Sequence, residues 1–223
     1  MAPPRLFDRK LHLQRRQRAA AGGDWPDFLL RRAAEDIADR LRAVERPFSR
    51  ILNIGAHDGT LSQAVAQALP RPALIVNMEA STPLLALCAA PKVRADEELL
   101  PFRDGAFDLI VSALSLQFVN DLPGSLVQIR RALKPDGLFL GAVLGGATLG
   151  ELREAFMQAE MECEGGVSPR VAPMADIRDF GALLQRAGFA LPVADADLVT
   201  ATYASPLALM QDLRPVLDRK SVV

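Results

Sequence analysis

The sequence predicts an α/β fold with a doubly wound, mostly parallel sheet and helices on both faces. Short runs of mostly apolar residues alternate with helical patterns along the chain, and the runs do not alternate strictly between apolar and polar residues. Strands of a parallel sheet are buried on both faces, and such buried strands read as continuous apolar runs. With 223 residues, the chain is long enough for one α/β domain and short for two.

The elements follow from these patterns in chain order. Apolar residues at steps of three and four predict an amphipathic helix over residues 25–44: Trp25, Phe28, Leu29, Ala33, Ile37 and Leu41. Short apolar runs predict strands over residues 50–55, 73–79, 92–96, 107–114 and 137–144. Helical patterns lie between and after them, over residues 61–69, 81–90, 123–133 and 176–189. The turn Pro135-Asp136-Gly137 is expected before the fifth strand, and Gly188 is expected to close the last of these helices.

These elements divide one expected domain over residues 1–223 into four parts. They are an N-terminal helical segment (1–45), a central core (48–144), an insertion (145–175) and a C-terminal helix, strand and helix (176–223). The insertion is rich in glycine and proline and follows a strand's carboxyl end, so we expect it to form a lid over the ligand crevice. Residues 191–203 are the candidate for the last strand, and residues 205–214 form the helix after it.

Composition excludes several classes of protein. The 26 basic residues nearly balance 27 acidic ones, so a general nucleic-acid-binding surface is not expected. Cys88 and Cys163 lie far apart, and the chain has two histidines, so we expect reduced thiols, no metal site and a cytoplasmic protein. No apolar stretch is long enough for a membrane span, and the N-terminus lacks the pattern of a secretion signal.

The first twenty residues are unusually basic. Asp8 is the one acid among six cations: Arg5, Arg9, Lys10, Arg15, Arg16 and Arg18. The favoured interpretation is a helix packed on the domain with its charges in solvent, because apolar side chains are mixed with the charges. A targeting segment and a basic contact to an acidic partner are the two alternatives.

The stretch ILNIGAHDGTLSQ, residues 51–63, carries the clearest chemical signal. A predicted strand enters it and a predicted helix leaves it, as in turns that hold a nucleotide at a helix start. Gly55 and Gly59 take the outer glycine positions, while His57 takes the middle one. If this backbone position needs a positive φ, a histidine there adds about 1 kcal/mol of strain or more.

Two acids follow the next two predicted strands. Glu79 ends the second strand, where a carboxylate can accept hydrogen bonds from both hydroxyls of a ribose, or can be a solvated strand end. Asp96 follows the third strand, where it could accept from the amino group of adenine, or serve as a helix cap or turn residue.

These motifs together resemble class I S-adenosylmethionine-dependent methyltransferases. The similarity rests on ILNIGAHDG, NME, ADEELLPFRDGAFDLIVSALSLQFVNDLP, IRRALKPDGLFLGAVLGGATLGELREAF and LLQRAGF, and it covers residues 5–213. Within that superfamily the chain is similar to the biotin-pathway carrier-protein methyltransferases and to the complex I assembly factor group. LFDRKLHLQRRQRAA, EGGVSPRVAP and YASPLALMQDL resemble the second group more closely.

The resemblance implies a cofactor, S-adenosyl-L-methionine, with S-adenosyl-L-homocysteine as its product. It matches Gly55 and Gly59 to the glycine turn, Glu79 to the ribose acid, and Asp96 with Glu97 to the adenine contact. The segment from Ser112 to Gln117 matches the part that borders the reactive methyl group, and Phe102 either packs beneath the adenine or belongs to the core. The full cofactor-binding set that it implies is Asn53, Gly55, Ala56, His57, Gly59, Glu79, Ala80, Asp96, Glu97, Ser112, Leu114 and Gln117.

The chain departs from this family in three places. Asn53 stands where the family usually has an acid, and His57 stands where it usually has a glycine. Both changes predict weaker binding of a cationic cofactor, and we interpret His57 as a replacement for glycine rather than as a general base. The family usually closes its sheet with two strands after the last long helix, whereas residues 191–203 are the single candidate here, so the C-terminal strand is expected to be missing. A homo-oligomer could cover the exposed edge.

The predicted function is methyl transfer from S-adenosylmethionine to a small-molecule or protein substrate. The resemblance implies a carrier-protein-linked acid or a protein side chain as the acceptor. No catalytic residue stands out, because methyl transfer from a sulfonium depends mainly on alignment of the reactants. The alternative is a non-methylating assembly factor, which would be either similar to a protein arginine hydroxylase or a degenerate binding module.

Overall fold

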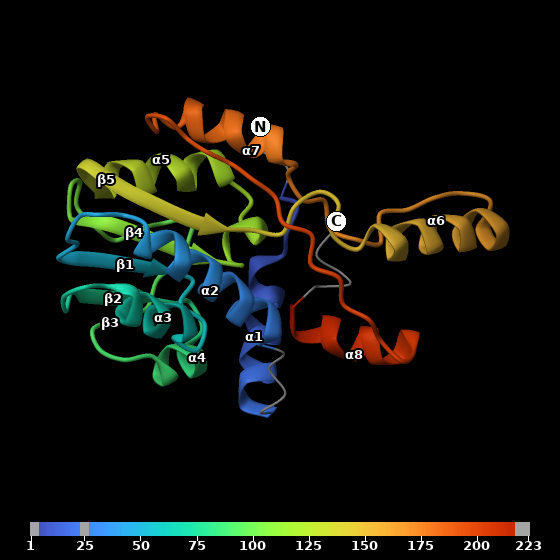
Figure 1. The fold of residues 1–223 in the computed structure, drawn as a ribbon. Helices are drawn as coiled ribbons and strands as arrows, with labels where there is room; N and C mark the ends of the chain where they lie inside the picture. The colour runs from blue at the N-terminus through green and yellow to red at the C-terminus, as the bar shows by residue number, and fades with distance from the viewer. Residues whose placement is uncertain (1–4, 23–26, 217–223) are drawn as a thin grey trace.

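The structure, a computed structural model, describes residues 5–22 and 27–216 and confirms the predicted fold class. Five parallel strands form one sheet in the order β3-β2-β1-β4-β5, with helices on both faces (Figure 1). The strands are β1 (Arg50–Ile54), β2 (Leu74–Met78), β3 (Lys92–Val93), β4 (Phe107–Ala113) and β5 (Leu133–Ala142). The helices are α1 (Arg9–Gly22), α2 (Phe28–Arg42), α3 (Thr60–Ala68), α4 (Thr82–Leu87), the 3₁₀ helix η1 (Leu116–Phe118), α5 (Leu122–Ala132), α6 (Gly150–Glu164), α7 (Ile177–Arg186) and α8 (Pro206–Val216).

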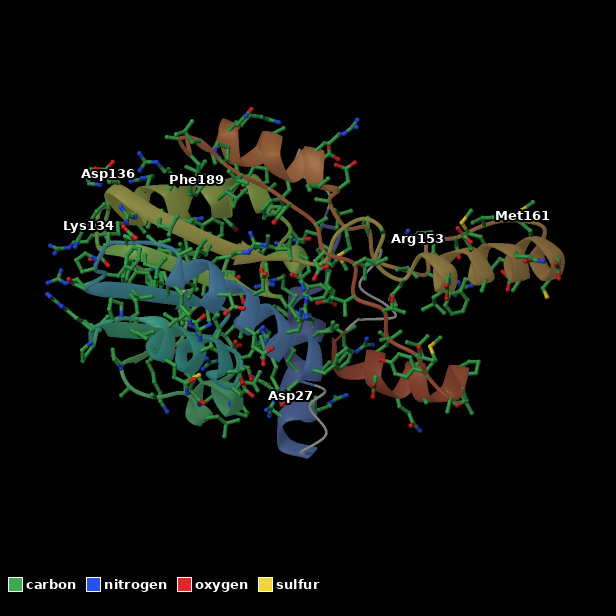
Figure 2. All side chains as sticks on the ribbon, viewed as in Figure 1. Asp27, Lys134, Asp136, Arg153, Met161 and Phe189 are labelled. Atoms are coloured by element: carbon green, nitrogen blue, oxygen red, sulfur yellow. The ribbon has the colours of Figure 1, made fainter. Side chains whose placement is uncertain are left out.

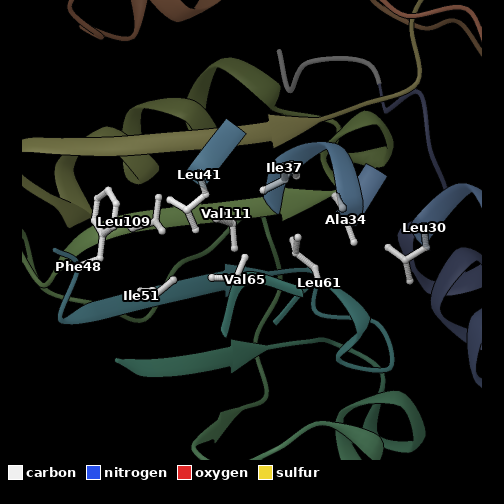
Figure 3. Close-up of a cluster of buried hydrophobic side chains, with 11 residues drawn as sticks. Leu30, Ala34, Ile37, Leu41, Phe48, Ile51, Leu61, Val65, Leu109 and Val111 are labelled. Carbon is white, nitrogen blue, oxygen red and sulfur yellow. The ribbon is translucent and has the colours of Figure 1, made fainter. Parts of the chain in front are cut away.

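Both faces of the sheet carry a hydrophobic core, which explains the continuous apolar runs. Successive side chains of a strand point to opposite faces. Ile51 packs with α2 and α3 in the first core cluster, whereas Leu52 and Ile54 pack with α5 and α7 in the second. Figure 3 shows the first cluster between the sheet and α2. Because β2 and β4 both run parallel to β1, the carboxyl ends of these three strands lie at the same edge of the sheet.

Most predicted elements are present with shifted ends. The predicted helix over residues 25–44 is α2, and Trp25 lies outside the described residues. Pro135-Asp136-Gly137 does not precede the fifth strand but lies within β5, where the pairing register shifts and Asp136 has a φ of 59°. Gly188 follows α7 with a φ of 87°, a conformation that favours glycine, so the predicted closing position is confirmed.

The predicted strand over residues 191–203 is wrong. This segment has no regular secondary structure, and two of its acids form ion pairs with α2: Asp197 with Arg32 and Asp195 with Arg40, both at 2.8 Å. A strand needs a hydrogen-bonding neighbour, but the segment is held along α2 instead. Within the described residues β5 is therefore at the edge of the sheet, with β4 as its partner.

Helix α6 of the insertion does not cover the ends of the strands, whereas Ala172 and Met174 near the end of the insertion pack against Phe7 and Phe118. In Figure 1, α6 extends away from the sheet, and Figure 2 shows Met161 far from the strands with Arg153 nearer to them. Exposed apolar side chains on α6 and just after it, including Met161 and Val167, agree with this position. The element that lies across the carboxyl ends of the strands is α1, which Figure 1 shows at that edge of the sheet.

Candidate functional site

The turn after β1 has the backbone conformation that its glycines permit. Gly55 and Gly59 have φ values of 63° and 91°, and Gly59 is the N-cap of α3. A side chain at position 55 is excluded, because a Cβ there would lie 2.1 Å from Ser115 Oγ. The N–H of Ala56 donates to the carbonyl of Met78 at 2.9 Å, which ties the turn to the end of β2. The sequence therefore produces the tight turn that its glycine spacing predicted.

His57 fills space within this turn. Its φ is 50°, so the histidine occupies the left-handed conformation that disfavours side chains, and 6% of its surface is exposed. Arg16 Nη2 lies 2.9 Å from His57 Nδ1, and His57 Nε2 lies 3.0 Å from the carbonyl oxygen of Ala113. A guanidinium can only donate, so Nδ1 accepts from Arg16 and Nε2 carries the hydrogen that it donates to Ala113.

This arrangement makes His57 unsuitable as a base. Burial and the nearby charge of Arg16 lower the pKa of His57 below its usual range, so the ring stays neutral. The lone pair of the neutral ring is on Nδ1, where it is already bonded to Arg16. His57 thus replaces glycine, as we interpreted it, and in addition anchors a side chain from α1.

Glu79 lies directly against the turn. Its side chain is fully buried at the end of β2, and Oε2 accepts from the backbone N–H of His57 at 3.0 Å. Oε1 accepts from the backbone N–H of Ser81 at 2.8 Å. The remaining partner is Arg16, whose Nη2 lies 2.8 Å from Oε2. The solvated strand end that was one alternative for Glu79 is therefore wrong.

Asp96 and Glu97 face the same helix from the segment after β3. Arg9 on α1 forms ion pairs with both carboxylates, 2.7 Å from Asp96 Oδ1. Glu97 is buried and also accepts from Ser115 Oγ at 2.8 Å. Burial opposes its ionisation, but Arg9 and Arg16 outweigh burial and lower the pKa of Glu97 to about 2. Asp96 also acts as a turn residue, because its Oδ1 accepts from the N–H of Glu98 at 2.9 Å.

Helix α1 therefore supplies two cations to the acids that the sequence predicted as nucleotide ligands. Arg9 and Arg16 are seven residues apart, two helical turns, so they share one face of α1. Sequence reasoning placed the charges of this helix in solvent, and for these two arginines that was wrong. The spacing of seven was the available signal, but it did not reveal which acids would receive the arginines.

The start of α1 is fastened by further contacts. His12 lies against Phe118 with 4.6 Å between ring centroids, and Phe7 meets the same ring edge-on at 5.9 Å. The side-chain amide of Asn120 pairs with both the N–H and the carbonyl of Phe7, at 2.8 and 3.1 Å. Burial, with the charges of Arg16 and Arg9, lowers the pKa of His12 to about 3. Helix α1 is thus packed into the edge of the sheet through buried polar and aromatic side chains.

The structure distributes the other predicted residues unevenly. Ser112 Oγ donates to the carbonyl of Ile54 within the sheet, and Leu114 has a φ of 52° just beyond β4. Asn53 is fully buried, and its amide donates to Asn77 Oδ1 at 3.2 Å across the β1–β2 pair. The carbonyl of Ala80 accepts from Arg94. The turn, Glu79, Glu97 and Ser115 therefore come together, whereas the amide nitrogen of Asn53 bonds to a neighbouring strand and its buried Oδ1 has no partner among the described residues.

Two other side chains near the site have structural contacts. Phe102 meets Phe107 edge-on at 5.0 Å and belongs to the second core cluster, as one of its two interpretations held. Both cysteines are free, in agreement with the reduced thiols that we expected. Cys88 is buried with its thiol 3.4 Å from the carbonyl of His57, and burial raises the pKa of this thiol to about 11. Such a thiol is unreactive at neutral pH.

The sheet order, the tight turn and the acid at the end of the second strand define a nucleotide-binding α/β protein of the class I methyltransferase type. A model of the family described as methyltransferase domain matches residues 52–141. The chain is 39% identical to the mitochondrial arginine-hydroxylase NDUFAF5 of Mus musculus, over 94% of this chain and 62% of that protein. It is 31% identical to the malonyl-[acyl-carrier protein] O-methyltransferase of Gallionella capsiferriformans, over 95% of this chain and 75% of that protein.

The chain belongs to the class I S-adenosylmethionine-dependent methyltransferase family. That assignment gives it S-adenosylmethionine as its cofactor. Solved structures show the same fold. A methyltransferase from Thermotoga maritima has a TM-score of 0.58 at 18% identity, and the match covers 80% of this chain and 81% of that protein's chain. The chain spans about three fifths of the length of the mouse relative.

Proposed function

We propose that the chain is an S-adenosylmethionine-dependent methyltransferase whose cofactor lies between the glycine turn and Glu79, Asp96 and Glu97. The observation that carries this proposal is the position of Glu79, a fully buried carboxylate 3.0 Å from the backbone of the glycine turn. A carboxylate at this place can accept hydrogen bonds from two ribose hydroxyls. Glu97 also lies close to Gly55, with its Oε1 3.4 Å from where a Cβ of that residue would be.

The residues fit the cofactor in type and position, but α1 holds them in the structure. Arg16 takes one oxygen of Glu79, and Arg9 takes Asp96 and Glu97. A nucleoside would have to compete with these guanidinium groups for the same carboxylates. We therefore propose that α1 moves, or that its arginines exchange partners, when the cofactor binds. The weakened binding expected from His57 would have the same origin, since His57 anchors Arg16.

The chain's own contribution to transfer would be alignment. The cofactor supplies an electrophilic methyl group on a sulfonium, which needs no acid to leave. Gly55 allows the backbone to approach closely, and Glu79 would fix the ribose and so the direction of the methyl group. We assign no catalytic residue. The acceptor that we propose is a carrier-protein-linked acid or a protein side chain, as the names of the two kinds of relative suggest.

Calorimetric titration with S-adenosylhomocysteine tests this proposal. We expect saturable binding to the unaltered chain and at least tenfold weaker binding to Glu79→Gln, which keeps the shape of the side chain but loses its charge. Asp104→Asn is the matched control, because Asp104 is exposed and pairs with Arg131 away from the turn. A ligand at a hundredfold excess over its Kd stabilises the native state by about 2.7 kcal/mol, so thermal unfolding gives a second readout. Absence of binding by both methods would overturn the proposal.

A second candidate function is a non-methylating assembly factor, either similar to a protein arginine hydroxylase or a degenerate binding module. The specific observation in its favour is that His57 and Arg16 are buried against the turn, with their nitrogen atoms 2.9 Å apart. The NDUFAF5 relatives, named as arginine hydroxylases, agree with it. If the chain is a degenerate module that does not bind the cofactor, neither S-adenosylmethionine nor S-adenosylhomocysteine will change its melting temperature.

The proposal also covers the cellular compartment of the protein and its possible oligomers. In the part of the chain that the structure describes, no helix has both the length and the apolar character needed to cross a bilayer. We propose a cytoplasmic protein, although the NDUFAF5 relatives are named as mitochondrial. The outer side of β5 could be covered in a homo-oligomer, since unpaired strand edges invite pairing.

A further inference from the structure

Helix α6 has one face packed on the chain that follows it and an opposite face that is exposed. On the packed face, Glu160 is buried and pairs with Arg170. Residues four positions apart lie on the same side of a helix, so Glu154, Gln158 and Glu162 form one row on the opposite face. All three side chains are exposed. The exposed face of α6 therefore carries a row in which a glutamine lies between two glutamates.

Helix α1 carries a row of the same spacing and of opposite charge. Arg9 and Arg16 point toward the acids at the ends of the strands. Lys10, Gln14 and Arg18 follow one another at steps of four on another face of the helix, and all three are exposed. In this row a glutamine lies between two cations, and each step along the helix is about 6 Å, as in α6. The two rows thus match in length and are opposite in sign.

Neither row is neutralised within the chain. In the part of the chain that the structure describes, Lys10, Arg18, Glu154 and Glu162 have no ion-pair partner. On α2, by contrast, basic side chains pair with acids three or four positions earlier. The whole chain has a net charge of -1, so two copies repel each other little, and α1 and α6 present opposite charges on separate surfaces. A surface of one sign attracts a surface of the opposite sign on another molecule.

We infer that α6 of one copy of this chain docks on α1 of a second copy, with the two charged rows face to face. In either direction of packing, each glutamate meets a cation and Gln158 meets Gln14. Rows of residues four apart are ridges along which two helices pack. Figure 1 shows α1 at the carboxyl ends of the strands and α6 projecting on the same side of the molecule, so a two-fold axis brings each α6 onto the other copy's α1. The dimer thus contains the same contact twice.

Exposed apolar side chains beside the rows add to the attraction. Met157 and Met161 flank the acidic row and are 44% and 59% exposed, and Leu6, just before α1, is 43% exposed. Exposed ion pairs are individually weak and are screened by salt, so removing one charge changes the affinity little. Burial of the apolar groups supplies affinity, while the charged rows select the partner and its orientation. We expect a dimer with a micromolar Kd that weakens as the salt concentration rises.

Sedimentation velocity of the full chain tests the inference. The unaltered chain should dimerise at about 0.05 M salt and at least tenfold more weakly at about 0.5 M. Two double variants reverse the rows: Lys10→Glu with Arg18→Glu, and Glu154→Lys with Glu162→Lys. Each variant alone brings like charges together at both contacts, so it should be a monomer. In a mixture of the two, opposite charges meet again at both contacts, so a dimer with one copy of each should form.

Glu35→Lys with Glu45→Lys is the matched control for the α6 variant. Both acids are exposed, on α2 and just after it, and the change in net charge is the same. The control should dimerise like the unaltered chain and should bind the α1 variant at least tenfold more weakly than the α6 variant does. Three results would each overturn the inference: a monomer at low salt, a dimer that persists in both reversed variants, as one formed through the edge of β5 would, and a mixture that binds no more tightly than the control mixture.

Discussion

Replacing Arg16 with methionine tests whether α1 competes with the cofactor. The Arg16 and Glu79 side chains are 6% and 0% exposed, and their atoms lie 2.8 Å apart, so the substitution leaves a carboxylate buried without its cation. Breaking a buried ion pair from one side costs about 3–5 kcal/mol. Glu79 keeps its two backbone donors, from His57 and Ser81, so we expect the lower end, about 3 kcal/mol. For a chain of this size that loss lowers the melting temperature by about 6–12 °C.

The same substitution should strengthen ligand binding. When the competent state is a minor one, apparent affinity falls in proportion to its population, so weakening α1 by about 3 kcal/mol can raise affinity by up to about 100-fold. Calorimetry with S-adenosylhomocysteine measures the affinity, and thermal unfolding measures the stability. The matched control is Arg18→Met, an exposed arginine on the same helix, which should change neither quantity. Weaker binding by Arg16→Met, with Arg18→Met unchanged, would refute the competition and make Arg16 a ligand contact.

Three further outcomes follow from the geometry. His57→Gly removes the strained φ and the side chain that anchors Arg16, so calorimetry should show severalfold tighter binding of S-adenosylhomocysteine; weaker binding would mean that the imidazole holds the ligand. The folded-state pKa of His12 is about 3, below its unfolded value of 6.5, so its contribution is complete above pH 6.5 and is lost as pH falls toward 3. His12 should therefore contribute a loss of about 2 kcal/mol between pH 7 and pH 5, and His57, whose pKa is also lowered, adds a loss of the same sign. Chemical denaturation should show a smaller slope for His12→Gln than for the unaltered chain, and an identical slope would exclude a contribution from His12. Asp195→Asn and Asp197→Asn remove ion pairs whose side chains are largely exposed, so each should cost less than about 1 kcal/mol of unfolding free energy, and a larger loss would show that residues 191–203 are held mainly by charge.

The sheet and most of its helices could be predicted because burial on both faces leaves a strong local pattern. Ile51 and Leu52 point into different cores, and both must be apolar, so the strand is visible as a run. The position of residues 191–203 could not be predicted in this way. Their apolar residues suggested a strand, but strand formation depends on a neighbouring edge, and the ion pairs of Asp195 and Asp197 with α2 are set by contacts far apart in sequence.

The candidate site was predictable where its parts are local. The tight turn at Gly55 and the acid at the end of β2 follow from the strand–turn–helix pattern and from the position of Glu79 after an apolar run. The arginines in the crevice were not predictable, because Arg16 meets Glu79 across 63 positions of sequence and looks like a solvated helix charge until the fold is known.

Hydrogen–deuterium exchange with and without S-adenosylhomocysteine is the most direct measurement of whether the nucleoside and α1 share one set of carboxylates. If they do, saturating ligand will slow exchange at the backbone of residues 55–59 and speed it along α1, whose arginines lose Glu79, Asp96 and Glu97. Unchanged exchange at residues 55–59, or slower exchange along α1 together with the turn, would contradict this competition.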